Sequence, residues 1–410
     1  MAGLKQTTEK LARYRRQFDK IINVTAKAGL SGAQSRDAGR LRDVTGFGSN
    51  PGNLRMRTYA PDALAPGAPL VVVLHGCTQT ADGYDSGAGW STLADRYGFA
   101  LLLPEQQRAN NANTCFNWFV PQDIHRDSGE ALSIRQMIER IVDEHQLDRS
   151  RAFVTGLSAG GAMTAVMLAT YQEVFAGGAI IAGLPYGTAG TLPEALESMF
   201  QGKSHPAKSW GDLVRRASPH AGPWPKVSIW HGSSDSTVQP VNADELVKQW
   251  TDIHDVGGKP SLEDKVDGYP HRVWRDASGE ALVESFTITG MAHGTPIKAG
   301  SADGETGTAG PFILEAGISS SYRIATFWGL IDPTAAKAAR ATRDATRPSE
   351  PGKVSGVGAG ATERPPARPS VPLSRRRGPT TRPAEPEKVS AFDPGAIISK
   401  ALKKAGLLKG

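Results

Sequence analysis

The sequence has few cysteines and no long hydrophobic run, and these absences exclude several classes of protein. Its 410 residues include two cysteines, Cys77 and Cys115. They are too few for a disulfide-rich scaffold and lack the spacing of a zinc site. No apolar run approaches the roughly 18 residues of a membrane-spanning helix. The basic N-terminus is followed by no apolar stretch of the kind found in a secretory signal, so a cytoplasmic location is expected.

Positive charge is concentrated near the C-terminus. Residues 334–410 contain 16 Lys and Arg against 6 Asp and Glu, a balance of +10, so the rest of the chain carries about −4 of the net +6. A binding protein that acts through this tail is one hypothesis, since basic segments hold nucleic acid or anionic surfaces. The tail has no interleaved aromatic residues, and no specific nucleic-acid partner is expected. Its charge says nothing about the substrate of the folded body.

Buried strands and amphipathic helices alternate through the middle of the chain. PLVVVLHG at 69–76 is typical of a strand buried on both faces, and residues 128–145 form a strongly amphipathic helical pattern. The other strands are expected at 99–106, 152–156, 176–184, 226–232 and, as a pair, within 271–290; the other helices at 90–97, 159–171, 241–253 and 311–330. This alternation predicts an α/β fold with a mostly parallel central sheet and helices on both faces.

The composition divides the chain into four predicted segments. Residues 1–50 hold a helix candidate followed by a polar, Gly-rich linker, and 51–333 form the folded domain. Residues 334–391 are rich in Pro, Arg and Ala with almost no large apolar residues, which predicts a disordered linker. Residues 392–410 place apolar side chains on one side of a helix and lysines mostly on the other. Such a basic amphipathic helix is typical of contact with a membrane or a polymer-granule surface.

A glycine-rich turn, Gly156-Leu157-Ser158-Ala159-Gly160, joins a predicted strand to a predicted helix. It has no Gly-Lys-[Ser/Thr] ending and no G-x-G-x-x-G spacing, so it is not a phosphate-binding loop of those types. It does match G-x-S-x-G, the nucleophile elbow of α/β-hydrolases. Flanking glycines are needed there because larger side chains would collide with the neighbouring backbone. Ser158 is therefore the candidate nucleophile.

A nucleophilic serine needs a base and an orienting acid, which follow it in the order Ser, Asp, His in this fold. Asp235 comes just after the predicted strand 226–232, at the edge where open α/β sheets place their sites. Three histidines follow it: His254 lies in a polar loop, His271 begins a strand, and His293 lies on a Gly-bounded loop after a strand. His293 is the candidate base.

Two backbone N–H groups are expected to bind the oxyanion. One belongs to Ala159, directly after the nucleophile, and the other to Cys77, in the loop after the strand 69–76. The sequence shows no metal-binding cluster and no cofactor motif, and the chemistry of such a site needs neither.

Together these motifs resemble the poly(3-hydroxybutyrate) depolymerase family of esterases, whose catalytic domain neighbours feruloyl and acetylxylan esterases. The resemblance covers about 50–330 and rests on LHGCTQTADGYDSGAGWSTLADRYGFALLLPEQ, CFNWF, GLSAGGAM, HGSSDSTV and GMAHG. It implies an α/β-hydrolase fold for 51–333, with Ser158, Asp235 and His293 as the triad and Cys77 in the oxyanion hole. It also implies that Trp118 lines the substrate cleft.

The family resemblance leaves the state of the cysteines and the substrate open. In secreted members the corresponding cysteines pair, which implies a Cys77–Cys115 disulfide, whereas a cytosolic chain would keep both thiols reduced. The expected function is hydrolysis of poly(3-hydroxybutyrate) or related short-chain polyesters and oligomers. A feruloyl- or acetylxylan-type carbohydrate esterase and a general carboxylesterase are the alternatives. Association with polymer granules through 392–410 is the expected partner contact, and an extracellular location reached by another route is the alternative to the cytoplasm.

Overall fold

The computed structural model describes residues 39–332 together with residues 9, 12, 13 and 16. The chain divides into two units, residues 1–336 and 337–410, and the described residues lie in the first. The predicted linker 334–391, the predicted helix 392–410 and most of the predicted segment 1–50 lie outside the described residues. Within the described part, no helix is both long and apolar enough to cross a membrane.

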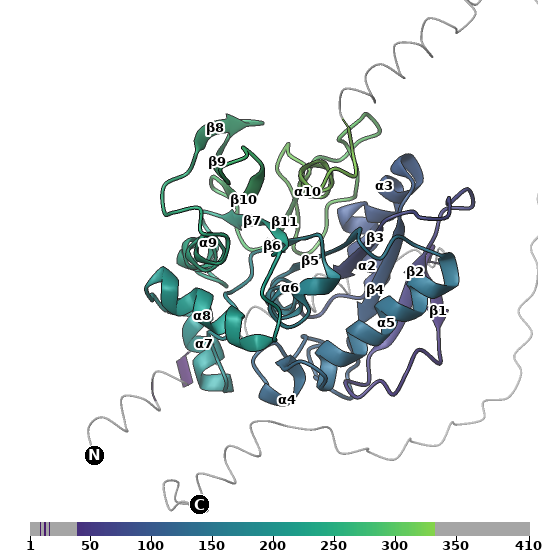
Figure 1. Cartoon of the computed structure of the whole chain (residues 1–410), viewed down its shortest axis with the longest axis horizontal. Helices are drawn as coiled ribbons and strands as arrows, with labels where there is room; N and C mark the ends of the chain where they lie inside the picture. Colours follow the sequence, from purple (N-terminus) through teal and green to yellow (C-terminus); the bar gives the residue numbers. More distant parts are fainter. Residues whose placement is uncertain (1–8, 10–11, 14–15, 17–38, 333–410) are drawn as a thin grey trace, which may run out of the picture. The chain divides into compact units, whose positions relative to one another are not determined.

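A ten-stranded sheet forms the centre of the domain, in the order β1-β2-β4-β3-β5-β6-β7-β10-β9-β8 (Figure 1). The strands from β4 to β10 in this order run parallel, and the pairs at both ends are antiparallel. A second sheet pairs β11 with β12. The strands are β1 Arg42–Val44, β2 Arg55–Tyr59, β3 Leu70–Leu74, β4 Ala100–Glu105, β5 Ala152–Leu157, β6 Gly177–Ile181, β7 Lys226–Gly232, β8 Leu262–Val266, β9 Tyr269–Arg275, β10 Ala281–Ile288, β11 Thr295–Ile297 and β12 Ile313–Glu315.

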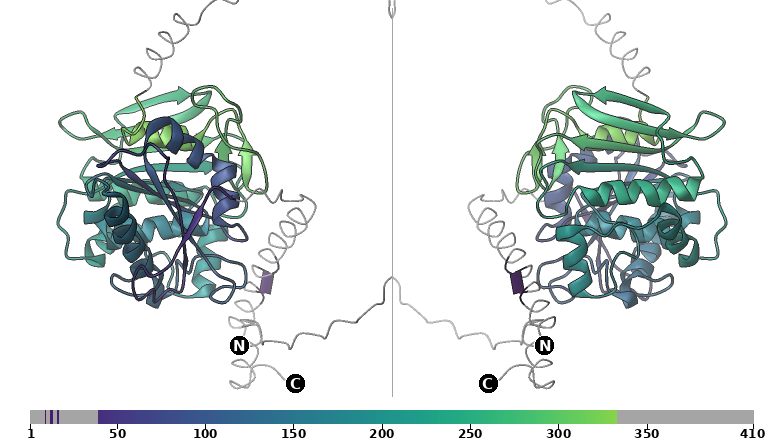
Figure 2. Two further views of the ribbon diagram at one scale, coloured as in Figure 1. Left: turned by 90° about the vertical axis from the view of Figure 1, so that its right-hand side faces the viewer. Right: turned by 90° about the vertical axis from the view of Figure 1, so that its left-hand side faces the viewer.

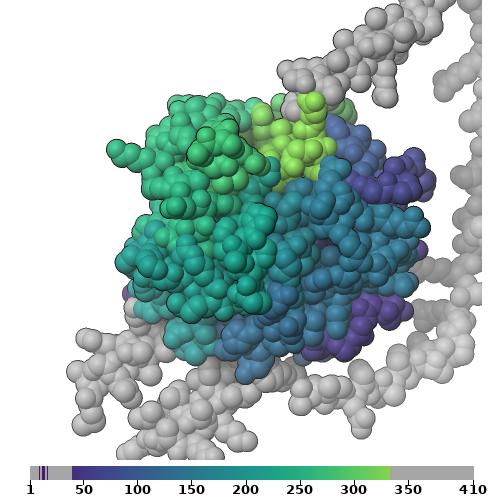
Figure 3. Space-filling view, viewed as in Figure 1, coloured from purple at the N-terminus to yellow at the C-terminus, as the bar shows by residue number. Residues whose placement is uncertain are grey.

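Helices cover both faces of the sheet (Figure 2). Alternate residues of β3 belong to two separate hydrophobic clusters. Val71 and Val73 pack with α2, α3 and α10, whereas Val72 packs with α5 to α9. The outer surface on the side of α5 and α8 is built from earlier (blue) and later (teal to green) parts of the described chain (Figure 3). The helices are α2 Ala81–Ala88, α3 Trp90–Tyr97, α4 Pro121–Ile124, α5 Gly129–His145, α6 Ala159–Thr170, η1 Gln172–Val174, α7 Leu192–Gln201, α8 Ala207–Ala217, α9 Val241–His254 and α10 Ser320–Phe327.

This architecture confirms the predicted α/β class, with a mostly parallel sheet covered on both faces. Every residue of β3, β4, β5 and β6 is buried, which explains why these strands read as continuous apolar runs. The single helix predicted over 311–330 is wrong. Residues Ile313–Glu315 instead pair with β11, and α10 begins only at Ser320, where the Ser319 hydroxyl accepts a hydrogen bond from the Tyr322 N–H.

The predicted boundary at residue 51 also needs correction. The strand β1 lies inside the segment interpreted as a linker, and it pairs with β2 in the main sheet. An ion pair of 2.9 Å between Arg55 and Asp43 crosses the two strands. The folded domain therefore begins before residue 51. A strand of three residues is too short to show a periodic pattern. Its extended conformation is stabilised by pairing with β2, and the local sequence does not reveal that pairing.

Candidate active site

The predicted site residues follow strands that lie side by side in the sheet. Cys77 comes after β3, Ser158 directly after β5, Asp235 after β7 and His293 after β10. In the sheet order, β5 adjoins β3, and β7 adjoins β10, with β6 between the two pairs. Because all these neighbours are parallel, the four segments leave the same edge of the sheet.

Ser158 occupies a strained backbone conformation at the turn between β5 and α6. Its φ is 58° and its ψ is −117°, a combination that non-glycine residues rarely adopt. The Ser158 N–H donates to the Ile181 carbonyl at 2.9 Å, which ties the turn to the end of β6. A Cβ at Gly160 would lie 2.2 Å from the Leu74 carbonyl oxygen, and one at Gly156 would lie 2.4 Å from the Gly160 oxygen. The glycines of the motif are thus required by close backbone contacts.

We expect Gly160→Ala to destabilise the domain by about 3 kcal/mol, because the added methyl meets rigid carbonyl groups of the β3 end and not a movable side chain. Ester hydrolysis should fall with it, since relief of the clash moves the elbow. Chemical unfolding and hydrolysis of a soluble ester measure the two effects. Gly258→Ala is the matched control, because a Cβ there has no atom within 4 Å. Equal stability of the two variants would contradict this packing argument.

Asp235 and His293 are in direct contact. The His293 Nδ1 donates to Asp235 Oδ2 at 2.7 Å. The other carboxylate oxygen accepts the N–H groups of Thr237 at 2.8 Å and Val238 at 2.9 Å. Burial opposes ionisation of Asp235, but the charge and hydrogen bond of His293, together with the nearby His231, outweigh burial and lower the pKa of this carboxyl. No hydrogen bond joins His293 to the Ser158 hydroxyl in the part of the chain that the structure describes.

A second histidine contacts the same acid and was missed at the sequence level. His231 is 3% exposed, and its Nε2 lies 2.8 Å from the Val238 carbonyl oxygen and 3.4 Å from Asp235 Oδ2. Since the carbonyl can only accept, Nε2 carries a hydrogen directed at this carbonyl, with the Asp235 carboxylate close beside it. The loop HGSSD offers a signal, because this histidine precedes the aspartate by four residues. His231 helps to hold the acid in place.

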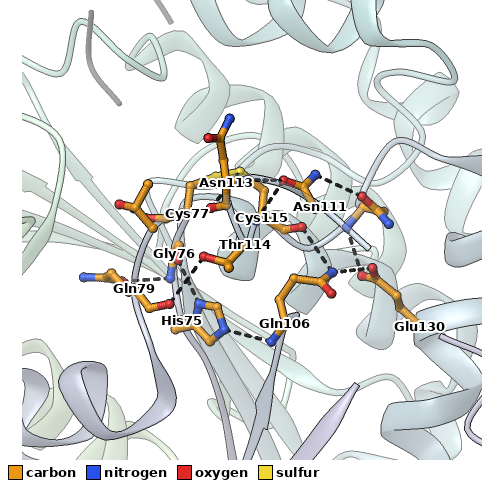
Figure 4. The surroundings of a disulfide bond; sticks show 12 residues. His75, Gly76, Cys77, Gln79, Gln106, Asn111, Asn113, Thr114, Cys115 and Glu130 are labelled. Carbon is orange, nitrogen blue, oxygen red and sulfur yellow. Dashed lines mark hydrogen bonds between the residues drawn. A yellow bond between two sulfur atoms is a disulfide. The ribbon is translucent and has the colours of Figure 1, made fainter. Parts of the chain in front are cut away.

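The predicted oxyanion loop is covalently tied to a second loop. Cys77 and Cys115 form a disulfide, the state that the family resemblance implies. Figure 4 shows this disulfide. The Thr78 N–H also donates to the Asn113 carbonyl at 2.7 Å. Among the described residues, the backbone N–H groups of Cys77 and Ala159 donate to no acceptor of the protein. Two N–H donors, at the buried Ala159 and the half-buried Cys77, are therefore available beside the serine elbow.

Removal of the disulfide by Cys115→Ser is expected to lower the free energy of unfolding by about 3 kcal/mol. The bond joins residues 38 positions apart, and a loop of that size restricts the unfolded chain substantially. Thermal unfolding with and without a thiol reductant measures the effect. The reductant should lower the Tm of the parent protein and leave that of the variant unchanged; an unchanged parent Tm would contradict the prediction.

Trp118, the predicted cleft residue, is largely buried. It is 7% exposed and belongs to the hydrophobic cluster that Val72 forms with α5 to α9. Its ring lies edge-on to Phe119 with centroids 5.3 Å apart. Only a small part of the indole is open to solvent, and its contact with substrate stays a prediction.

A buried acid supports the loop that carries Cys115, and nothing in the sequence pattern singled it out. Glu130 has no exposed surface, and its two oxygens accept hydrogen bonds from the Gln106 side-chain amide at 2.5 Å and the Asn117 N–H at 2.9 Å. Burial, followed by the nearby charge of Asp123, raises the pKa of Glu130 to about 8. The residue falls in the first turn of an ordinary amphipathic helix, so no local signal distinguishes it from a surface acid.

Glu130 should make the domain less stable as the pH rises. Its pKa is raised in the folded state, so the unfolded chain loses the proton first, and stability falls between roughly pH 4.5 and pH 8. The total effect is on the order of 5 kcal/mol. Glu130→Gln should flatten this part of a plot of unfolding free energy against pH, whereas Glu263→Gln, at an exposed acid of β8, should not. Parallel curves for the parent protein and Glu130→Gln would contradict the assignment.

The sheet topology and the serine elbow define the protein as an α/β-hydrolase. A family model described as esterase PHB depolymerase matches residues 56–258. Poly(3-hydroxyalkanoate) depolymerase C of Paucimonas lemoignei is 50% identical over 292 residues, which cover 71% of this chain and 70% of that protein. The chain therefore belongs to the PHB depolymerase family of esterases and is a carboxylic ester hydrolase.

Carbohydrate esterases are also similar. Feruloyl esterase B of Neurospora crassa is 35% identical over 288 residues, covering 67% of this chain and 92% of that protein. The solved structure of an acetyl xylan esterase from Aspergillus awamori matches with a TM-score of 0.61 at 25% identity, covering 72% of this chain and all of that one. The fold is thus shared between esterases with differently named substrates.

Proposed function

We propose that the protein hydrolyses poly(3-hydroxyalkanoates), or oligomers of them, with Ser158 as nucleophile, His293 as base and Asp235 as orienting acid. The observation that carries the proposal is the 2.7 Å hydrogen bond between His293 and Asp235 at the sheet edge that also bears the serine elbow. It leaves His293 Nε2 as the nitrogen that exchanges protons with the reacting groups. The 50% identity to a poly(3-hydroxyalkanoate) depolymerase favours a polyester substrate.

The proposed reaction is a two-step acyl transfer. His293 Nε2 takes the proton of the Ser158 hydroxyl as Oγ bonds to the ester carbonyl carbon, and the Cys77 and Ala159 N–H groups bind the oxyanion. The C–O bond to the alcohol then breaks, and the alcohol leaves with the proton held by His293. Water attacks the acyl-enzyme while giving a proton to His293. The acid product leaves, and the proton returns to Ser158.

Asp235 has an electrostatic task in this scheme. Its carboxylate faces His293 Nδ1 and stabilises the imidazolium that forms in each step. The lowered pKa of Asp235 keeps it ionised at neutral pH. Its second oxygen is held by the Thr237 and Val238 amides, so the carboxylate orients the ring without being free to rotate.

A carbohydrate esterase is the alternative function, favoured by the similarity to feruloyl and acetylxylan esterases. A panel of purified-enzyme assays separates the two: 3-hydroxybutyrate oligomers and polymer suspension, methyl ferulate, acetylated xylan and short p-nitrophenyl esters, with Ser158→Ala as the blank. The proposal expects the highest kcat/KM on the hydroxybutyrate oligomers. Preference for the ferulate or the xylan would overturn the polyester assignment and leave the serine-esterase mechanism in place.

We also propose that residues 392–410 contact a polymer-granule or membrane surface, on the basis of their apolar and lysine-rich sides. Deletion of 391–410 should release the protein from granules or liposomes without changing activity on soluble esters; unchanged partitioning would reject this contact.

A granule-associated location in the cytoplasm accords with the proposed surface contact. The Cys77–Cys115 disulfide favours the alternative, export to an oxidising compartment. Cell fractionation distinguishes the two locations: recovery with the granules supports the first and recovery from the medium supports the second.

A further inference from the structure

A buried histidine contacts the oxyanion loop and has no part in the reaction described above. His75 follows β3 and is 1% exposed, and its ring packs against Phe116 with centroids 5.0 Å apart. Its Nδ1 lies 2.8 Å from the Gly76 carbonyl oxygen. Its Nε2 accepts a hydrogen bond of 3.1 Å from the Gln106 backbone N–H (Figure 4). Both ring nitrogens are therefore engaged with the backbone.

These two partners fix the proton on the His75 ring. The Gln106 N–H can only donate, so Nε2 must accept and carries no hydrogen. The Gly76 carbonyl can only accept, so Nδ1 carries the hydrogen. Burial lowers the pKa of His75, which keeps the ring neutral. His75 is thus a neutral imidazole in a single tautomer, unlike His293, which must gain and lose a proton in each cycle.

The Gly76 carbonyl belongs to the same peptide unit as the Cys77 N–H. This peptide bond is trans, so the carbonyl and the N–H point in opposite directions. A donor that holds the Gly76 oxygen therefore also sets the direction of the Cys77 N–H. Hydrogen bonding to the oxygen polarises the peptide unit and strengthens the N–H as a donor.

We infer that His75 is a positioning residue of the oxyanion hole: its Nδ1–H orients and polarises the Gly76–Cys77 peptide so that the Cys77 N–H meets the negative oxygen of the tetrahedral intermediate. This inference rests on the proposed function, because it requires the Cys77 amide to be an oxyanion donor. An N–H group aimed before the reaction begins stabilises the transition state more than one that must rotate into place.

The support for His75 extends further into the core. The Gln106 side-chain amide donates to the Cys115 carbonyl at 3.2 Å and to Glu130 at 2.5 Å, and its oxygen accepts the Gln107 N–H at 2.9 Å. Gln106 is 3% exposed. These contacts hold the backbone N–H that selects the tautomer of His75. The oxyanion loop is therefore fixed from two sides, by the disulfide and by this chain of hydrogen bonds.

Two substitutions separate the two hydrogen bonds of His75. His75→Asn places an amide N–H near the position of Nδ1 and loses the acceptor at Nε2. His75→Gln reaches the position of Nε2 with an amide oxygen and loses the donor to Gly76. We expect kcat on a soluble ester to fall about 10- to 100-fold in His75→Gln and His75→Leu and to stay within about threefold in His75→Asn, with little change in KM.

A trifluoromethyl ketone provides the readout that a purely structural role would not move. Ser158 adds to its carbonyl and forms a hemiketal oxyanion, so its affinity reports on the oxyanion donors. It should bind about 10- to 100-fold more weakly to His75→Gln than to the parent protein or to His75→Asn. Equal loss of kcat in all three variants, in parallel with loss of unfolding free energy, would overturn the inference.

One measurement needs no variant at all. Nitrogen NMR of the imidazoles in the parent protein at neutral pH should show a His75 ring protonated at Nδ1 alone. A ring protonated at Nε2 would overturn the inference. Failure of the proposed function gives a different result from failure of the role of His75, because Ser158→Ala would then stay active. An inactive Ser158→Ala together with a fully active His75→Gln would reject only the role of His75.

Discussion

Ser158→Ala should lower kcat for every ester that the protein hydrolyses by about 10⁵-fold or more, because no acyl-enzyme forms without the hydroxyl. The fold should be unaffected, since Ala fits the space of Ser and the turn is held by backbone contacts such as the 2.9 Å hydrogen bond to Ile181. The remaining activity would come from substrate binding and the oxyanion donors alone. The measurement is the initial rate on a short p-nitrophenyl ester.

A matched control for this variant lies on the loop that bears the acid. Ser236 is exposed and adjoins Asp235 in the chain, and Ser236→Ala should retain full activity. A fluorophosphonate should label the parent protein on the peptide containing Ser158 and leave Ser158→Ala unlabelled. Hydrolysis by Ser158→Ala at more than a thousandth of the parent rate, or labelling elsewhere, would sink the nucleophile assignment.

Asp235→Asn is expected to lower kcat by about 10⁴-fold, by analogy with the effect of the same change in serine hydrolases. The amide removes the charge that stabilises the His293 imidazolium, and its N–H₂ group can turn toward Nδ1 and select the wrong tautomer. The Thr237 and Val238 N–H groups keep an oxygen to bind, so the loop should stay folded. Rates on a soluble ester and thermal unfolding measure activity and integrity separately.

Asp244→Asn is the control for the acid, because Asp244 is a nearby exposed carboxylate on α9 that pairs with Arg272. It should keep activity within about twofold.

The pH dependence of stability gives a second check on Asp235. The pKa of Asp235 is lowered in the folded state, so its contribution to stability is present above about pH 4 and is lost only as the pH falls below this value. Asp235→Asn should not show this loss of stability at acidic pH. A drop in kcat of tenfold or less would contradict the catalytic role of Asp235.

The elements that could be predicted have strong local patterns. Residues 226–232 form β7 as expected, and helices α3, α5 and α9 begin and end within about two residues of their predictions. A strand buried on both faces must be apolar throughout, and a helix with one buried face must repeat every three to four residues. Among the missed helices, α4 has only four residues, whereas α7 and α8, with ten and eleven, are longer than the correctly predicted α3. The missed strand β8 is largely exposed and obtains its order from β9.

The candidate site divides in the same way. Gly156 and Gly160 could be interpreted from the sequence because close backbone contacts allow no other side chain, and the structure supplies those contacts. The roles of His75 and Glu130 could not be predicted, because their hydrogen-bond partner Gln106 lies 31 and 24 positions away from them in the sequence. A buried polar group looks like any other polar residue until the atoms that satisfy it are placed beside it.

The sequence alone thus determined the α/β class and the serine elbow, because strand and helix patterns and the G-x-S-x-G turn each depend on residues close together in the chain. It also predicted the acid and the base, from the order Ser, Asp, His that is typical of this fold. Tertiary structure decided which strands adjoin and therefore that His293 meets Asp235, 58 residues before it, at 2.7 Å. It also decided that residues 313–315 form a strand, that β1 joins the main sheet, and which nitrogen of His75 carries the proton. These outcomes depend on contacts between distant segments, and only the folded chain brings those segments together.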